Sequence, residues 1–411
     1  MASASKVGNF NLNSSTGNQS ITDVGFQPKV VIFWYDQITG SGSFTGYRRG
    51  MGVATSSTAR AASYANEGDA LGVSVMGTSI TNALCIQTVT SSASTTINEA
   101  DFVSMDPNGF TINVTKVSGT PTIQYLALGG NDLTNAYVGV AQRKTSTGTQ
   151  AYTGVGFQPD AMMIFTMANF TSIPAISAVT NIQTTFGVCD GATSKVTANY
   201  IQYNVTTTNT ERRQSSSIYL SLNGSGGVSA EATFTSFDSD GFTLNWTTAN
   251  ASATYFIVVC LKGGSYNVGT FNQNTSTGNQ VVTGTGFEPT GVLFSAYMST
   301  TSASTAAEAR WSLGGASSST SRGVLWSGST DNQADSICDT YNDLTKVIKF
   351  MIEGTPTLIA EADFVSMDPN GFTINNTTVD ANAREVVYFA HRLLTNEDPA
   401  TTNRGFATII G

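Results

Sequence analysis

Short apolar runs alternate with polar, turn-rich stretches along the whole chain. Three of the densest are Val-Val-Ile-Phe-Trp at 30–34, Met-Met-Ile-Phe at 162–165 and Val-Leu-Phe at 292–294. These runs are short and rich in β-branched and aromatic residues, so they predict central strands covered on both faces. Segments 100–103 and 110–113 alternate apolar and polar residues, and they predict the two strands of a hairpin with one solvent-exposed face. Helical periodicity is scarce, and only residues 58–71 and 305–313 predict a short helical turn.

A Gly-Phe-x-Pro motif occurs three times, at 25–28, 156–159 and 286–289, with steps of 131 and 130 residues. Recurrence at a fixed period is the signature of tandem modules. In each copy the proline fixes φ and keeps the preceding residue extended. We expect the phenylalanine side chain to pack against the core and so to anchor the loop.

A second motif, Ser-Thr-Gly-x-Gln, lies upstream at 15–19, 146–150 and 276–280, with the same steps. It stands between alternating apolar segments and contains Gly or Asn, which favour the positive φ of a tight hairpin turn. We therefore expect a hairpin at this point of each module.

A third motif, Asp-x-(Asn/Asp)-Gly-Phe, lies downstream at 106–110, 238–242 and 368–372. It predicts a hairpin turn with the aspartate as cap and the glycine in the left-handed region. Residues 99–113 are identical to residues 361–375, whereas the middle copy differs at several positions. Three motifs in one order at one period establish a triplication.

The predicted fold is all-β, with three tandem antiparallel β-sandwich modules of a jelly-roll-like kind, each with roughly eight strands. The expected modules are 1–130, 131–264 and 265–411, with Gly-Gly pairs marking the first two ends. About eight residues link the first two modules, a span of at most roughly 25–30 Å, so neighbours must pack side by side. A constant step predicts either a closed ring, which is a pseudo-trimer, or a short rod. The sides of the modules carry little charge and can pack against one another at little desolvation cost, which favours the closed ring.

The charge is low and acidic: charged residues form 11% of the chain and the net charge is −9. Clustered Lys and Arg are needed to neutralise a phosphate backbone, so this balance argues against a nucleic-acid partner. The basic pairs at 48–49, 143–144 and 212–213 do not extend to a third residue, and we interpret them as solvated loop charges. Without an apolar run of about 20 residues or an h-region near the start, neither a membrane span nor a signal peptide is expected.

The four cysteines sit at unmatched offsets within the modules, so they predict free, buried thiols rather than a built-in disulfide or zinc site. These residues are Cys85, Cys189, Cys260 and Cys338. The side-chain oxygens of Asp106 and Asn108 lie two residues apart, a spacing that is also found among the ligands of calcium-binding loops. A calcium loop needs more carboxylates and a later bidentate Glu, so a plain turn is favoured and no metal or cofactor is expected.

Catalytic candidates are few, and we expect no enzyme and no catalytic residue. The single histidine, His391, has no counterpart in the other copies and no Gly-x-Ser-x-Gly elbow beside it. The recurring Glu99, Glu231 and Glu361 could in principle act on glycosides as a carboxylate pair. Their repeated position at a strand entrance indicates architecture instead.

The motifs resemble those of a β-rich domain family of tailed-bacteriophage virion proteins. The similarity is carried best by Gly-Phe-Gln-Pro-Asp at 156–160, Asp-Ser-Asp-Gly-Phe at 238–242 and the strand at 254–262, which ends Cys-Leu-Lys. The first and third copies depart by using Asp-Pro-Asn-Gly, and only the middle copy keeps the Cys-x-Lys ending. The resemblance implies a virion structural component made in the host cytoplasm, and it carries over no catalytic residues.

Within a virion, the modules fill the chain from its first ten residues nearly to Gly411, leaving no adaptor of the kind that tail fibres carry. A capsid decoration or cement protein on the head surface is therefore the favoured function, with the major capsid protein or other virion proteins as partners. The alternative is a tail-fibre or receptor-binding protein that binds host-surface glycans. That function predicts exposed aromatics at matched positions, and Trp34, Trp246, Trp311 and Trp326 do not recur.

Overall fold

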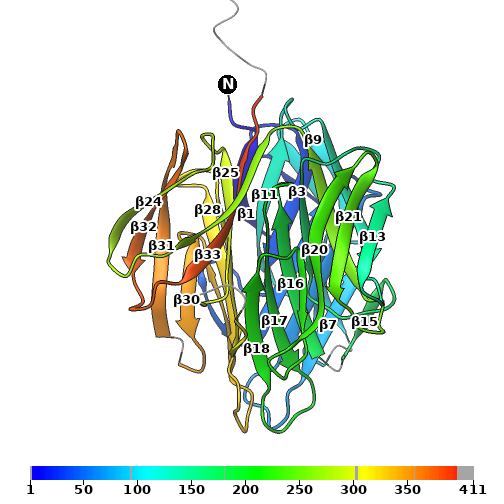
Figure 1. The fold of residues 1–411 in the computed structure, drawn as a ribbon, viewed down its shortest axis with the longest axis vertical. Helices are drawn as coiled ribbons and strands as arrows, with labels where there is room; N and C mark the ends of the chain where they lie inside the picture. Colours follow the sequence, from blue (N-terminus) through cyan, green and yellow to red (C-terminus); the bar gives the residue numbers. More distant parts are fainter. Residues whose placement is uncertain (1, 93–94, 180, 301–303, 356, 396–411) are drawn as a thin grey trace, which may run out of the picture.

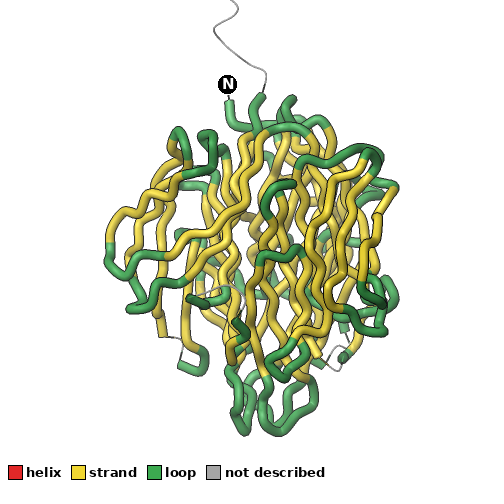
Figure 2. The backbone as a smooth tube through the Cα atoms, in the orientation of Figure 1, coloured by secondary structure: helices red, strands yellow, loops and turns green. Residues whose placement is uncertain are grey.

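The computed structural model describes residues 2–92, 95–179, 181–300, 304–355 and 357–395. Strands joined by loops make up these residues, and no helix occurs among them (Figure 2). The predicted all-β class is therefore confirmed, and within the described ranges no helix could cross a membrane.

The described chain contains 33 strands, eleven in each third, which is more than the roughly eight expected. The first third holds β1 (Ser5–Asn11), β2 (Gly17–Ile21), β3 (Pro28–Tyr35), β4 (Gly42–Thr45), β5 (Tyr47–Ala54), β6 (Arg60–Glu67), β7 (Met76–Thr81), β8 (Ile86–Val89), β9 (Thr96–Asp106), β10 (Gly109–Lys116) and β11 (Thr122–Gly129). The second holds β12 (Asn135–Gln142), β13 (Gly148–Thr153), β14 (Ala161–Thr166), β15 (Ala175–Ser177), β16 (Asn181–Cys189), β17 (Ser194–Gln202), β18 (Thr210–Ser215), β19 (Tyr219–Leu222), β20 (Val228–Asp238), β21 (Gly241–Thr248) and β22 (Tyr255–Lys262). The last holds β23 (Ser265–Asn272), β24 (Gly278–Thr283), β25 (Gly291–Ala296), β26 (Ala306–Ala307), β27 (Ala309–Ala316), β28 (Arg322–Ser329), β29 (Cys338–Asp343), β30 (Ile348–Ile352), β31 (Thr357–Asp368), β32 (Gly371–Thr378) and β33 (Glu385–Arg392).

The expectation of helical turns at 58–71 and 305–313 is wrong, because these segments contain β6 and the strands β26 and β27. Alanine favours helices in isolation, but tertiary packing overrides that preference. Seven of the eight residues of β6 are buried, and its small side chains let covering layers approach both faces.

Each third forms two antiparallel sheets in the same strand order. In the first, six of its own strands run β1-β11-β3-β5-β6-β7, and a smaller sheet runs β2-β10-β9-β8. Half of the neighbouring pairs are consecutive strands, and the other half join strands that are further apart in the chain. The other two thirds repeat both orders with their own strands. We refer to these units as the first, second and third modules.

Each large sheet has a seventh strand that comes from another module. Strand β15 of the second module pairs with β7 of the first, and β26 of the third module pairs with β18 of the second. Strand β4 of the first module pairs with β29 of the third, with Phe44 opposite Thr340. The three donations form a closed cycle, so no module completes its large sheet without another.

The apolar runs are buried on both faces, as predicted from the sequence. In β3, the side chains of Val30, Ile32 and Trp34 join one apolar cluster, and those of the residues between them join another. The first cluster collects side chains from the large sheets of all three modules, whereas each module also has a cluster between its own two sheets. A shared core therefore joins the modules in addition to their sandwich cores.

Strand register defines two ends of the molecule. Ser5 pairs with Leu128, and Leu128 pairs with Val30, at the end where the chain begins. Ser3 forms a bridge with Leu394, so the last described residues return to the same end (Figure 1). We call this end the terminal end. The donated strands follow the opposite ends of β3, β14 and β25.

Candidate functional site

The Gly-Phe-x-Pro and Asp-x-(Asn/Asp)-Gly motifs meet in space at the terminal end of each module. The Gln27 and Gln158 side chains donate to the carbonyl oxygens of Met105 and Phe237. The N–H of Gly156 donates to Asp240 Oδ1 (2.6 Å), and the N–H of Gly286 donates to Asn370 Oδ1 (2.7 Å). In the second and third modules, the third residue of the Asp-x-(Asn/Asp)-Gly turn therefore holds the Gly-Phe-x-Pro loop. The phenylalanine of that loop is half-buried against the sandwich core in every module, as expected.

The turn aspartates bind neighbouring hydroxyls. Asp106 accepts hydrogen bonds from Ser104 Oγ (2.7 Å) and Thr111 Oγ1 (2.6 Å), and Asp238 and Asp368 repeat both contacts. In the described chain, no group of three or more His, Cys, Asp or Glu side chains is arranged to hold a metal ion. These aspartates therefore act as structural caps of the turn.

The turn glycines are required for two reasons. Their φ angles of 149–159° are positive, as the motif predicted, and residues with a side chain rarely adopt them. A Cβ on Gly109 would lie 1.8 Å from the carbonyl oxygen of Ile21, and Gly241 and Gly371 meet the equivalent carbonyls at 1.9 Å. The positive φ and the close approach of β2 and its counterparts both exclude a side chain here.

The repeated glutamates do not converge on one another, because each lies in the small sheet of its own module. Glu99 accepts a hydrogen bond from Gln87 (3.2 Å), and Glu231 accepts one from Ser217 (2.6 Å). Glu361 pairs with Lys349 (2.8 Å). Each carboxylate binds its own neighbouring strand, and the repeated position serves the sheet.

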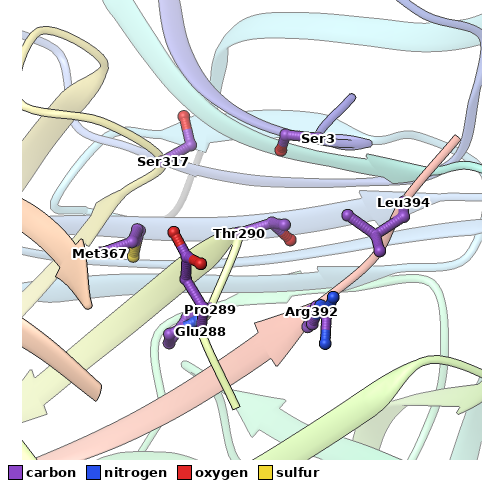
Figure 3. Close-up of a pocket in the computed structure, with 8 residues that line it drawn as sticks. All are labelled: Ser3, Glu288, Pro289, Thr290, Ser317, Met367, Arg392 and Leu394. Atoms are coloured by element: carbon purple, nitrogen blue, oxygen red, sulfur yellow. The ribbon is translucent and has the colours of Figure 1, made fainter. Parts of the chain in front are cut away.

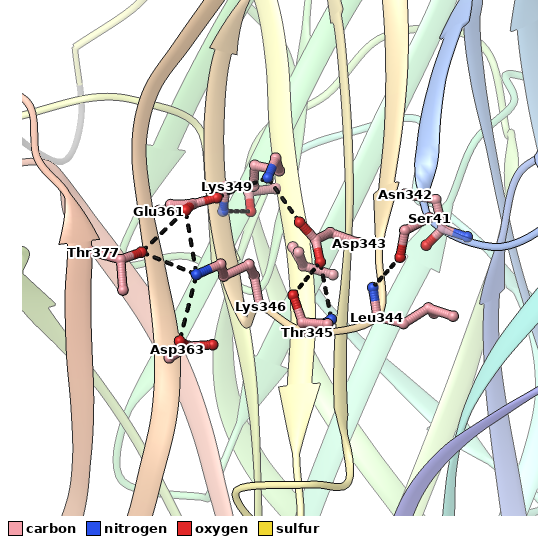
Figure 4. Close-up of polar contacts among 12 residues, drawn as sticks. Ser41, Asn342, Asp343, Leu344, Thr345, Lys346, Lys349, Glu361, Asp363 and Thr377 are labelled. Carbon is pink, nitrogen blue, oxygen red and sulfur yellow. Dashed lines mark hydrogen bonds and ion pairs between the residues drawn. The ribbon is translucent and has the colours of Figure 1, made fainter.

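Glu361 belongs to an ionic network in the third module (Figure 4). Lys349 bridges Asp343 and Glu361 at 2.8 Å each, and Lys346 reaches Asp363 at 3.4 Å. Burial raises the pKa of Glu361, but the hydrogen bond and charge of Lys349 outweigh it and leave the pKa below its usual range. The network lies beside the donated strand β4, and the N–H of Leu344 donates to the Oγ of Ser41, the residue just before that strand (3.1 Å).

His391 is fully buried, and its Nε2 lies 2.7 Å from Ser5 Oγ. Its Nδ1 is buried without a hydrogen-bond partner, so no carboxylate orients the ring as a catalytic triad requires. Burial lowers the pKa of His391 to about 3, which keeps the ring neutral. The pair joins the last strand of the third module to the first strand of the first module.

The predicted free, buried cysteines are confirmed for all four residues. Burial raises the pKa of the Cys85 and Cys260 thiols, which opposes thiolate formation and reactivity. All four tryptophan side chains are also buried, with at most 1% of each exposed. None of them can serve as an aromatic platform for a glycan.

The interpretation of the basic pairs as solvated loop charges is wrong. Arg49 lies in β5, is fully buried, and donates to the carbonyl oxygens of Trp311 (2.9 Å) and Leu325 (2.6 Å) in the third module. Arg212 lies in β18 and pairs with Glu308 (2.8 Å) beside the donated strand β26. Arginines therefore join modules, and the sequence signal that could have found them is a charge within an alternating strand.

The residue after the proline of each Gly-Phe-x-Pro motif binds the segment that leaves the module. The three contacts are Lys29 Nζ to the Leu133 carbonyl (2.5 Å), the Gly263 N–H to Asp160 Oδ2 (2.7 Å) and the Leu393 N–H to Thr290 Oγ1 (2.9 Å). A cation, an anion and a hydroxyl thus perform one task at three equivalent positions, which sequence comparison alone would not suggest.

A pocket lies beside this contact at two of the junctions. Between the third and first modules it measures about 320 Å³ and is lined by Ser3, Glu288, Pro289, Thr290, Ser317, Met367, Arg392 and Leu394 (Figure 3). Between the second and third modules it measures about 520 Å³, and its walls include Asp160, Asp190, Phe237 and Tyr266. The two pockets occupy equivalent places but differ in chemistry, because only the second has two carboxylates and two aromatic rings.

No protein-family model matches this chain, and no curated protein is significantly similar to it.

Proposed function

We propose that this chain is a non-enzymatic virion structural protein of a tailed bacteriophage, a decoration or cement protein on the head surface. Its partners would be the major capsid protein or other virion proteins. One observation carries the proposal: each module donates a strand to another in a closed cycle, around a core shared by all three. Such a chain is the covalent counterpart of a homotrimer and can occupy a threefold or quasi-threefold site.

Chemistry at the junctions supports a structural role. Buried arginines and the Ser5–His391 pair join modules, and the contacts after each proline hold the segment that leaves the module. None of these groups combines a solvent-accessible nucleophile with an oriented base. The identical segments 99–113 and 361–375, against a divergent middle copy, suit attachment to a lattice whose contacts are only quasi-equivalent. The resemblance of the motifs to phage virion domains points the same way.

The test is a cryo-EM reconstruction of the intact virion with gold-labelled antibody against this protein as an independent marker. The expected result is density of this three-module shape over threefold or quasi-threefold positions of the head. Label confined to the tail tip would reject the head assignment in favour of a fibre.

A receptor-binding function is the second candidate, and the pocket between the second and third modules favours it. Carbohydrate sites combine ring faces for sugar C–H groups with carboxylates that accept hydroxyl protons, and Phe237, Asp160 and Asp190 supply such groups. A glycan array separates the two functions. Binding that is lost in Asp190→Ala, while Ser317→Ala at the equivalent position leaves it unchanged, would support the receptor-binding function.

A further inference from the structure

The middle module differs from its neighbours at two nearby positions on adjacent strands of the large sheet. The residues are Phe10, Ala141 and Phe271 at the first position and Tyr125, Val258 and Tyr388 at the second. In the first module the two rings lie 6.2 Å apart, and both pack against the phenylalanine of the hairpin motif. The third module repeats this arrangement at 6.4 Å. The middle module therefore lacks two aromatic rings that its neighbours place between their sheets.

Two tyrosines at other positions refill part of this space. Tyr152 stacks on Phe242, with ring centres 5.0 Å apart. The hydroxyl of Tyr137 lies over Gly139, where the first module has the hydroxyl of Tyr125 over Gly8. The replacement is incomplete, since a pocket of about 250 Å³ remains.

The remaining pocket opens to the surface; most of its lining residues are apolar, although its exposed lining also includes polar groups. Its walls include Val140, Ala141, Val155, Phe242 and Val258. Ala151 and Thr153 line it as well and are exposed, so the pocket reaches solvent. A cavity of roughly 150 Å³ already holds benzene, so about 250 Å³ suffices for a substituted ring.

The pocket lies between β12 and β13, which are edge strands of their two sheets. In the first module Gln19 closes this side: its Oε1 accepts the N–H of Asn13 (2.9 Å), and its Nε2 donates to the Asn11 carbonyl (2.7 Å). Gln280 makes both contacts in the third module. In the middle module the equivalent Gln150 has a buried Oε1 without a partner.

The carbonyl that this glutamine would bind in the middle module is taken instead by Tyr152, whose hydroxyl donates to the Gln142 carbonyl (3.0 Å). The two hydrogen bonds that Gln19 and Gln280 make in the other modules are thus replaced in the middle module, at the same edge that contains the pocket. Tyr152 takes part in both changes, the altered ring packing and the altered hydrogen bonding, and both affect one side of the middle module.

We propose that this pocket receives an aromatic side chain from an extended segment of a partner polypeptide. The other two modules fill the same space with a phenylalanine, which identifies the chemistry of the occupant. Edge strands on both sides of the opening can form backbone hydrogen bonds with an extended segment. For this reason we expect the aromatic ring to belong to a polypeptide rather than to a free small molecule. The site is separate from the proposed attachment to a lattice and does not depend on it.

The test uses the full chain with two probes, p-cresol and the peptide acetyl-Thr-Val-Tyr-Val-Thr-amide, in ligand-observed NMR and calorimetry. We expect p-cresol to bind and the peptide to bind at least tenfold more tightly, while the same peptide with Ala in place of Tyr does not bind. Ala141→Phe, which restores the residue of the other modules, should abolish both interactions. Ala141→Leu is a second filling variant, and Thr149→Ala on the same edge strand is the control that should leave binding unchanged.

Thermal melting of every variant keeps folding separate from binding. Absence of binding by both probes, or binding that persists in the filling variants, would overturn the proposal. Binding of p-cresol with no gain for the tyrosine peptide would assign the pocket to a free small molecule and reject the polypeptide.

Discussion

The guanidinium of Arg49 lies 3.9 Å from the ring centre of Trp311 in another module and donates a hydrogen bond to the Trp311 carbonyl oxygen. A second bond to the Leu325 carbonyl (2.6 Å) leaves the fully buried charge held by backbone oxygens and a ring face. Burial lowers the pKa of Arg49 to about 10, so the side chain stays charged at neutral pH. The shared core thus contains a cation that only the assembled modules can accommodate.

Arg49→Met should destabilise the protein by about 2–4 kcal/mol, because two buried carbonyl oxygens lose their charged donor. Urea unfolding followed by tyrosine and tryptophan fluorescence measures the change. Arg60→Met is the matched control, since its ion pair with Asp101 is partly exposed and contributes about 1 kcal/mol or less. Equal effects of the two substitutions would contradict the central role of Arg49.

Two buried acids should make the protein less stable as the pH rises. Burial raises the pKa of Asp36 and of Glu67 to about 7 each, although Arg48 and Arg49 act against this for Asp36. Their stabilising contribution is complete below about pH 4, where both states are protonated, and is lost as the pH approaches 7.

Glu67→Gln isolates this effect, with a change of at most about 3 kcal/mol between pH 4 and pH 8. The melting temperature of the variant, measured across this range, should fall less than that of the parent chain. Glu288→Gln, the same substitution at an exposed glutamate, is the control. Parallel curves for Glu67→Gln and the parent would show that Glu67 does not titrate in this range.

The buried His391 should act in the opposite direction. Its folded pKa of about 3 lies below the ordinary value of 6.5, so its contribution is present above pH 6.5 and is lost as the pH falls. Between pH 6.5 and pH 5 the loss amounts to about 2 kcal/mol.

The chain itself supplies the replacement residues, because Leu128 and Leu261 stand at the position of His391, and Ala136 stands at that of Ser5. Ser5→Ala combined with His391→Leu should flatten the loss of stability below pH 6.5 in thermal melts. Unchanged acid sensitivity in this double variant would assign that sensitivity to other groups.

Gly109→Ala should cost at least about 3 kcal/mol, because its Cβ would lie 1.8 Å from a backbone oxygen and the hairpin must move away from β2. Gly72→Ala is the control, since the nearest atom to its Cβ would be 3.6 Å away. Chemical denaturation of both variants gives the comparison. A mild effect of Gly109→Ala would mean that the two strands separate easily at this point.

The sequence by itself determined the strand content, the triplication and the local turns. These follow from spacing along the chain: a run of alternating or apolar residues predicts a strand, and a motif such as Asp-x-(Asn/Asp)-Gly-Phe predicts a hairpin wherever it occurs. Burial of the cysteines could be foreseen for the same reason, because a small apolar residue within an apolar strand is almost always covered. Residues 58–71 contain a strand rather than the expected helical turn, because β6 pairs with β5 and β7 and is buried along almost its whole length.

Only the tertiary structure decided which groups meet across modules. The donated strands are short and have few apolar residues, so nothing in their own sequence distinguishes them from loops; they are strands because a partner edge in another module supplies their hydrogen bonds. Arg49 is a buried cation for the same reason, since its partners lie more than 260 residues away in the chain. The pocket of the middle module depends on Ala141 and Val258 lying close together on paired strands, where Val258 is opposite Gly139 and Ala141 is opposite Phe256, and strand register, which sets that pairing, is a property of the folded sheet.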